Sequence, residues 1–185
     1  MDIKREQFLA KLKAHGLAED IPNVTLTNAK FIHLLVGLYQ PKKILEIGMA
    51  NGYSTCWLAD AAESYGGEVL CYEISEPGWI AARENFKTMG LENITIRQTN
   101  ALREPPAEDE TFDLIFVDGQ KAHYHEFWEL AKKHLNPNGL IIFDDVVKFS
   151  KKTEPFRLAM EQDQDYEKVL LPIDAEDGIM MVRKK

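Results

Sequence analysis

The segment that decides the fold is Ile44–Thr55, which has the sequence ILEIGMANGYST. An apolar run ending in an acid is followed by two glycines four positions apart and then by a polar helix start. This order predicts a buried strand, a tight turn and a helix N-terminus, where α/β proteins bind nucleotide-like ligands. Gly48 would let the chain turn sharply off the strand, and Gly52 would let the backbone approach a ligand without an intervening Cβ.

The alternation of strand and helix continues along the chain. Strands are predicted at residues 44–47, 68–72, 94–96, 114–117 and 140–143, and helices at 55–63, 77–89, 124–134 and 155–162. Repeated βα units indicate an α/β fold with a doubly wound, mostly parallel, seven-stranded sheet and helices on both faces. The last two strands, 166–171 and 179–182, are joined through residues 174–178, too short a connection for a helical crossover. They should therefore pair antiparallel.

The residues before the deciding segment also have helical spacing. Four apolar residues near the N-terminus, Ile3, Phe8, Leu9 and Leu12, are placed as on one face of a helix. Thr27 is predicted to be the N-cap of a second helix, which runs to Tyr39 and ends before Pro41.

Composition restricts the compartment and the partners. The net charge of −8 argues against non-specific binding to nucleic acid or to an anionic membrane. Cys56 and Cys71 lie within apolar runs and are predicted to be core residues in a reducing compartment rather than a disulfide. Four of the first six residues are charged, and no apolar run approaches membrane-spanning length. We therefore expect a soluble, cytoplasmic protein with no membrane partner.

Two acids flank the glycine turn. Glu46 precedes it, and Glu73 closes the next apolar run. A carboxylate at Glu46 would repel a phosphate but suits a cationic ligand group, whereas Glu73 is placed to accept ribose hydroxyl protons. Ala50 stands where a dinucleotide fingerprint has glycine, which disfavours an NAD-dependent oxidoreductase. The alternative, that both acids are solvated strand ends, explains one acid more easily than two.

Three further carboxylates close later strands. Asp118 ends the fourth strand, and Asp144 and Asp145 end the fifth. If these strands are neighbours, the three acids meet at one edge of the sheet, where they repel one another unless a cation or protons intervene. Ligation by oxygen alone suits Mg²⁺, Mn²⁺ or Ca²⁺. Each acid taken alone could instead cap a helix or lie in a solvated loop.

The motif Glu-x-Gly-x-x-x-Gly-Tyr-Ser at residues 46–54 resembles motif I of class I S-adenosylmethionine-dependent methyltransferases. More narrowly, the chain resembles the magnesium-dependent O-methyltransferases of the catechol and caffeoyl-CoA type, from about Val24 to the C-terminus. The resemblance implies a Rossmann-like methyltransferase domain over residues 1–185, in which helices in residues 1–40 cover the cofactor and acceptor site. It implies that S-adenosylmethionine is bound by Val24, Leu26, Glu46, Gly48, Gly52, Tyr53, Ser54, Glu73, Asn100, Ala101 and Asp118. The family usually has Asp at the position of Asn100.

The resemblance also implies a metal and catalytic site. Asp118, Asp144 and Asp145 would bind the metal, with Asp145 adding a charge where the family has Asn. Lys121 matches the lysine that acts as general base in catechol-type enzymes, with Asp118 beside it as the second catalytic residue. A lysine near a divalent cation can have a lowered pKa, although an ordinary exposed lysine is the alternative. The implied reaction methylates a metal-bound hydroxyl of a small, catechol-like aromatic acceptor.

The acceptor itself is not specified by these motifs. Four aromatic residues could stack on a flat ring, or belong to the core: Tyr53, Tyr124, Trp128 and Phe149. Lysines 148, 151 and 152 could meet an anionic acceptor, such as a coenzyme A thioester or an RNA backbone, or form a solvated basic loop. Relatives that methylate a hydroxylated uridine make tRNA an alternative acceptor, and relatives that dimerise suggest a homodimer. A metal-independent methyltransferase and a cofactor-binding protein without turnover also stay open.

Overall fold

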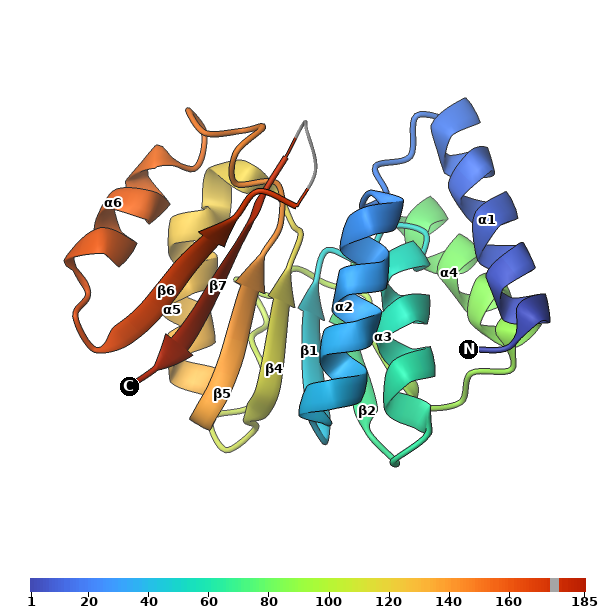
Figure 1. Ribbon diagram of the computed structural model, residues 1–185, viewed down its shortest axis with the longest axis horizontal. Coiled ribbons are helices and arrows are strands. Elements are labelled where there is room, and N and C mark those ends of the chain that lie inside the picture. The colour runs from blue at the N-terminus through green and yellow to red at the C-terminus, as the bar shows by residue number, and fades with distance from the viewer. Residues whose placement is uncertain (174–176) are drawn as a thin grey trace.

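A seven-stranded sheet runs through the computed structural model, which describes residues 1–173 and 177–185 (Figure 1). The strand order is β3-β2-β1-β4-β5-β7-β6. The strands are β1 (Lys43–Ile47), β2 (Glu68–Tyr72), β3 (Ile94–Arg97), β4 (Phe112–Val117), β5 (Leu135–Phe143), β6 (Tyr166–Leu171) and β7 (Ile179–Lys184). β1 to β5 pair in parallel, whereas β7 is antiparallel to both of its neighbours. The predicted sheet with an antiparallel last strand is therefore confirmed.

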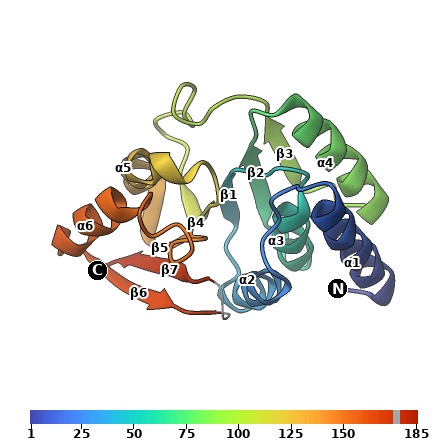
Figure 2. The same cartoon turned by 90° about the horizontal axis from the view of Figure 1, so that it is seen from above.

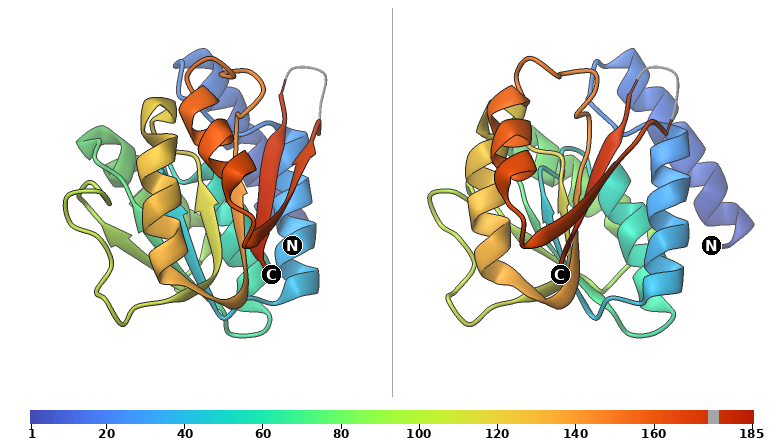
Figure 3. Two further views of the ribbon diagram at one scale, coloured as in Figure 1. Left: turned by 90° about the vertical axis from the view of Figure 1, so that its left-hand side faces the viewer. Right: turned by 60° about the vertical axis from the view of Figure 1, so that its left-hand side comes forward.

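Helices cover both faces of this sheet (Figures 2 and 3). One layer contains α1 (Ile3–Ala18), α2 (Leu26–Tyr39), α3 (Tyr53–Glu63) and α4 (Glu76–Met89). The other contains α5 (Tyr124–His134), preceded by the short turn Lys121–His123, and α6 (Glu154–Gln162). Each layer packs its own hydrophobic cluster against the sheet, as the nearly continuous apolar strands require.

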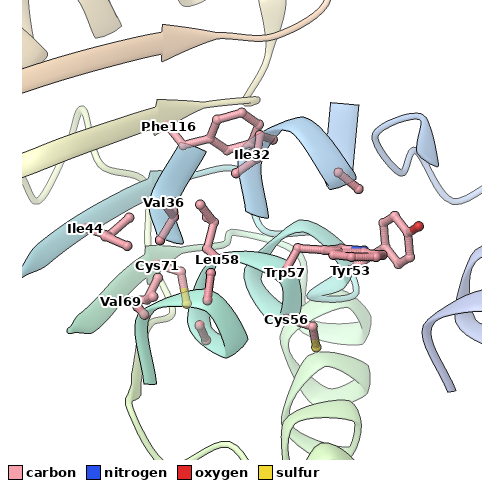
Figure 4. Close-up of a cluster of buried hydrophobic side chains, with 14 of the residues drawn as sticks. Ile32, Val36, Ile44, Tyr53, Cys56, Trp57, Leu58, Val69, Cys71 and Phe116 are labelled. Carbon is pink, nitrogen blue, oxygen red and sulfur yellow. The ribbon is translucent and has the colours of Figure 1, made fainter. Parts of the chain in front are cut away.

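The core beneath α2 and α3 fixes the position of β1 (Figure 4). Ile32 and Val36 of α2 meet Leu58 of α3 and Ile44 of β1, and all four side chains have no exposed surface. Burying an aliphatic side chain of this size stabilises a fold by about 1.5–3 kcal/mol. Cys56 and Cys71 are buried and free, as predicted.

The predicted start of α2 is wrong by two residues. Thr25, not Thr27, is the N-cap, and its side chain accepts a hydrogen bond from the backbone N–H of Asn28 at 3.2 Å. Thr25 has the extended backbone that an N-cap needs, whereas Thr27 already lies in the first helical turn.

Other predicted boundaries also shift, and two of these shifts have a clear structural cause. α3 begins at Tyr53 rather than at Thr55, because Gly52 has a left-handed backbone (φ 81°) that ends the turn directly before it. β5 begins at Leu135, well before the predicted residue 140, because Leu135 pairs with Phe112 of β4 across a register shift.

Residues 174–176, part of the predicted connection between the last two strands, lie outside the described residues. Within the described part of the chain, no helix combines the length and apolar character needed to cross a membrane.

Candidate functional site

The carboxyl ends of β1, β4 and β5 meet at the upper edge of the sheet in Figure 1, and the turns that follow them contact one another. Gly48, in the turn after β1, has φ 93°, and a Cβ there would lie 2.7 Å from the backbone carbonyl of Asp118 after β4. Glycine is required at this position because no side chain fits between the two turns. Gly48 therefore brings the glycine turn against the first of the predicted metal ligands.

Gly52 is constrained by a helix contact that the sequence did not reveal. A Cβ on Gly52 would lie 2.5 Å from Cε1 of Phe86 in α4. The absence of a side chain therefore lets α3 begin close against α4, which is a packing requirement at this position.

Glu46 is completely buried at the end of β1. Its carboxylate accepts hydrogen bonds from Ser54 Oγ at 2.6 Å and Thr55 Oγ1 at 2.5 Å, both in the first turn of α3. Burial raises the pKa of Glu46 to about 7, because the charged form loses its hydration. Glu46 therefore holds the start of α3 from a fully buried position through these two hydrogen bonds.

Glu73 lies half-buried after β2 and links two backbone turns. Its Oε2 accepts from the N–H of Ala50 at 2.7 Å, and its Oε1 accepts from the N–H of Ser75 at 2.7 Å. Each carboxylate oxygen retains a further lone pair, so the group can still accept hydroxyl protons while it braces the glycine turn.

The other predicted cofactor residues lie in different environments. Asn100 is half-buried, and its Oδ1 accepts from the N–H of Leu102 at 2.8 Å, which leaves its amide N–H₂ for another partner. Ala101 and Val24 are buried, whereas Leu26 is 48% exposed at the start of α2. Tyr53 is buried beside Trp57 in α3 (Figure 4).

The three predicted metal ligands come together. One carboxylate oxygen each from Asp118, Asp144 and Asp145 lies within 4.8 Å of the others. Burial raises the pKa of Asp144 well above its usual range, and the neighbouring Asp118 and Asp145 raise it further. Converging carboxylate oxygens in a poorly hydrated place fit a hard divalent cation, which would offset their repulsion.

Lys121 joins this cluster. Its Nζ donates to Asp118 Oδ1 and lies 3.2 Å from Asp145 Oδ2. Burial lowers the Lys121 pKa, but the Asp118 and Asp145 carboxylates raise it by more, so the net direction is upward. The predicted lowering is therefore not produced by the protein's own groups, and it would need a competing cation on the carboxylates.

Sequence analysis missed Asn28, which reaches the acid cluster from α2. Its Nδ2 donates to Asp144 Oδ1 at 2.7 Å, and both side chains are about 1% exposed. Asn28 Oδ1 has no hydrogen-bond partner among the described residues. The available signal was a polar residue four positions before Ile32, on the buried stripe of the helix.

Asp177 was also missed. Its Oδ1 accepts from the backbone N–H groups of Val147 at 3.3 Å and Lys148 at 3.1 Å, and so fixes the turn that follows Asp145. Asp145 itself has a left-handed backbone, with φ 58°. Asn and Asp adopt this conformation more readily than other side chains do, which accounts for the residue type at this position.

Most of the aromatic candidates belong to the core. Tyr53, Tyr124 and Trp128 are at most 1% exposed, and the Tyr124 hydroxyl donates to the Asp144 backbone carbonyl at 2.7 Å. Phe149 alone among the four is half-buried rather than buried.

Comparisons of the sequence with a family model and with known proteins agree with one another. Residues 45–146 match a family model described as "Methyltransferase domain". A catechol O-methyltransferase of Niastella koreensis is 34% identical over 143 residues, which cover 72% of this chain and 64% of that protein. A protein of Dictyostelium discoideum named "Probable caffeoyl-CoA O-methyltransferase 1" is 28% identical over 202 residues, covering 99% of this chain and 86% of that protein.

A solved structure is similar over nearly the whole chain. The O-methyltransferase from Bacillus cereus, in complex with SAH, has a TM-score of 0.85 and 28% identity, and the match covers 97% of this chain and 91% of that chain. The chain thus spans nearly all of this structure but only 64% of the Niastella koreensis enzyme.

Proposed function

The chain belongs to this methyltransferase domain family, and from that premise we propose that it is an S-adenosylmethionine-dependent O-methyltransferase acting on a hydroxyl of a small, catechol-like aromatic acceptor. The observation that carries the proposal is a cluster of three carboxylates and Lys121 whose first member, Asp118, has its backbone directly against the glycine turn after β1. A methyl donor held at that turn would lie beside a site built to hold a hydroxyl group.

The cofactor proposal rests on the groups around the turn. The Glu73 carboxylate has lone pairs left for ribose hydroxyls, and the Asn100 amide N–H₂ is left for the adenine. Ser54 stands between the buried Glu46 and the turn, where it would meet the methionine end of the donor. The SAH in the Bacillus cereus structure supports the same ligand class.

We propose a metal-assisted reaction because the donor set of Asp118, Asp144 and Asp145 fits a divalent cation such as Mg²⁺. When bound, such a cation would lower the pKa of an acceptor hydroxyl. Asn28 fixes one oxygen of Asp144, so the carboxylate presents its other oxygen in a set orientation.

Lys121, in its neutral form, would take the proton that leaves the acceptor hydroxyl; a cation on Asp118 and Asp145 would favour that form by competing for the carboxylates that otherwise raise the pKa of Lys121. The hydroxyl oxygen then attacks the sulfonium methyl carbon with an electron pair, and the carbon–sulfur bonding pair goes to sulfur and neutralises its charge. The products are a methyl ether and S-adenosylhomocysteine. The site contributes proximity and alignment of two bound substrates.

The test is S-adenosylhomocysteine release from a panel of vicinal-diol aromatics and hydroxyuridine-containing tRNA, with Mg²⁺ or with EDTA. We expect turnover of a diol that EDTA abolishes and Mg²⁺ restores, and that Asp144→Asn lowers by at least about tenfold. Asp109→Asn, in an exposed loop, is the control and should match the unchanged protein.

Turnover that EDTA does not change would contradict the metal proposal but would still support methyltransferase activity. Turnover of the tRNA alone would replace the small acceptor. S-adenosylhomocysteine binding without turnover of any acceptor would instead identify a cofactor-binding protein.

A further inference from the structure

The turn that follows the acid pair, residues 146–153, carries Phe149 between three lysines. Its backbone is held from two sides. The N–H of Val146 donates to the carbonyl of Gly178 at 3.1 Å, next to the Asp177 contacts with Val147 and Lys148. The turn therefore presents its side chains from a fixed base rather than from a loose loop.

Thr153, at the other end of this turn, points its side chain back into the turn. It has no exposed surface, and its Oγ1 lies 3.3 Å from the backbone carbonyls of Val146 and of Phe149. The side chains between these two residues are consequently positioned by buried hydrogen bonds.

Phe149 offers a half-buried ring surrounded by cations. Lys152 Nζ lies 5.4 Å from the ring centroid, Lys148 Nζ lies 5.7 Å from it, and Lys121 Nζ lies 6.0 Å from it. This spacing is within the range of cation–π contact. The ring of Phe149 therefore lies within reach of Lys121 on one hand and of the exposed Lys148 and Lys152 on the other.

The lysines around the ring differ in whether a carboxylate pairs with them. Lys121 is neutralised by Asp118 and Asp145. Lys148 and Lys152, in contrast, have no carboxylate within 4.0 Å in residues 1–173 and 177–185. Two such ammonium groups beside one ring repel each other, and this arrangement occurs in a chain whose net charge is −8.

A fourth cation enters from α1. Lys13 Nζ donates to the backbone carbonyls of Asn23 and Val24, both at 2.8 Å. Burial lowers the pKa of Lys13, and the charge of Lys148 lowers it further, whereas Asp144 raises it. The charge of Lys13 therefore interacts with Lys148 of the turn and with the acid cluster.

We propose that the acceptor is a hydroxylated aromatic that carries a carboxylate, with its ring against Phe149 and its carboxylate held by Lys148 and Lys152. This inference rests on the proposed function and names the substrate class for it. The acceptor's hydroxyl would then reach Lys121 and the acid cluster, because Lys121 Nζ lies 6.0 Å from the centroid of the same ring and is paired with Asp118.

A small anion fits these observations better than a polyanion does. One half-buried ring is a platform for a single flat group, and the lysines gather around it rather than forming a stripe. A nucleic-acid backbone requires cations at successive phosphates. The acidic balance of the chain as a whole opposes a long anionic ligand.

The test compares 3,4-dihydroxybenzoate with 3,4-dihydroxybenzamide, which differ in charge but hardly in shape. We expect kcat/KM to favour the benzoate by about tenfold or more, mainly through KM, and to lose that preference at high salt. The double variant Lys148→Gln/Lys152→Gln should bring the ratio close to one. Lys151→Gln, which alters an exposed lysine of the same turn, is the matched control and should keep the preference.

Titration of both compounds into the enzyme loaded with S-adenosylhomocysteine and Mg²⁺ gives a readout that does not depend on turnover. Equal binding of benzoate and benzamide, or an equal effect of Lys151→Gln and the double variant, overturns the inference. Displacement of the benzoate by an RNA oligonucleotide at far lower concentration also overturns it, in favour of a polyanion. Failure of every diol to be methylated, with the benzoate still preferred in the titration, overturns the proposed function but not the anion site.

Discussion

Replacing Glu46 by Gln should change how the stability of the protein depends on pH. The Glu46 carboxylate has no exposed surface, and its pKa is raised from 4.5 to about 7 by burial. Between these two values the folded protein binds a proton that the unfolded chain has lost. Stability contributed by this group is therefore full below about pH 4.5 and falls as pH rises towards 7.

The size of the effect follows from the shift. A difference of about 2.5 pKa units, at about 1.36 kcal/mol per unit, corresponds to a loss of about 3 kcal/mol across the window. Gln at this position does not titrate, so the Glu46→Gln protein should lack that loss. As pH rises, the free energy of unfolding of the variant should therefore increase relative to that of the unchanged protein, whatever stability the substitution costs at low pH.

Urea unfolding at pH 5 and at pH 8.5 measures this difference directly. The free-energy gap between the Glu46→Gln and unchanged proteins should move by about 2–3 kcal/mol in favour of the variant. Glu108→Gln, in an exposed loop, controls for removal of a charge and should show parallel curves. Parallel curves for Glu46→Gln as well would refute the account of a carboxyl group that is costly to ionise beneath α3.

Three further substitutions have expected outcomes. Gly48→Ala should lower the free energy of unfolding in urea by at least about 1–3 kcal/mol, because φ is 93° and the new Cβ would meet backbone atoms. Gly37→Ala is the control and should cost no stability, because nothing lies within 4 Å of a Cβ there. Equal losses for the two variants would contradict this reasoning. Asn28→Ala should weaken Mn²⁺ binding, measured by electron paramagnetic resonance, about 10–100-fold. Thr25→Ala removes the N-cap of the same helix and should leave Mn²⁺ binding unchanged. Equal weakening by the two substitutions would contradict a role for the Asn28 amide. Burial raises the pKa of Asp60, but contacts from α1 and α2 lower it by more, so its stabilisation is present above about pH 4 and lost below it. Asp60→Asn should therefore destabilise the protein at pH 7 and much less at pH 3, and an effect independent of pH would contradict the ion pairs.

The strand, turn and helix at residues 44–63 could be predicted because their signals are local. An apolar run, a glycine with positive φ and a polar helix start follow one another without a break, and each acts on the backbone next to it. The convergence of Asp118 with Asp144 and Asp145 was also predictable, since parallel neighbouring strands bring their carboxyl ends together.

Contacts between distant segments were not predictable in the same way. Asn28 and Asp144 are 116 positions apart, and their hydrogen bond depends on how α2 lies across the sheet. The Gly52 constraint likewise comes from Phe86 in another helix. The pKa of Lys121 depends on a balance of burial against two carboxylates, which residue spacing does not reveal.

The charges at the edge of the sheet connect the acid cluster to the lysines of the next turn. Asp145 adds a carboxylate where the catechol-type pattern has a neutral Asn, and the lysines after it could be explained as counterions for that charge. Lys121, however, already lies 3.2 Å from Asp145 Oδ2. Lys148 and Lys152 lie instead around the ring of Phe149, with no carboxylate within 4.0 Å in the described residues. Burial raises the pKa of Asp145, and the charge of Lys148 is among the groups that lower it. A full counterion role, however, would place the ammonium groups on the acid, and their position beside the ring leaves both charges available to an anionic group that lies against Phe149.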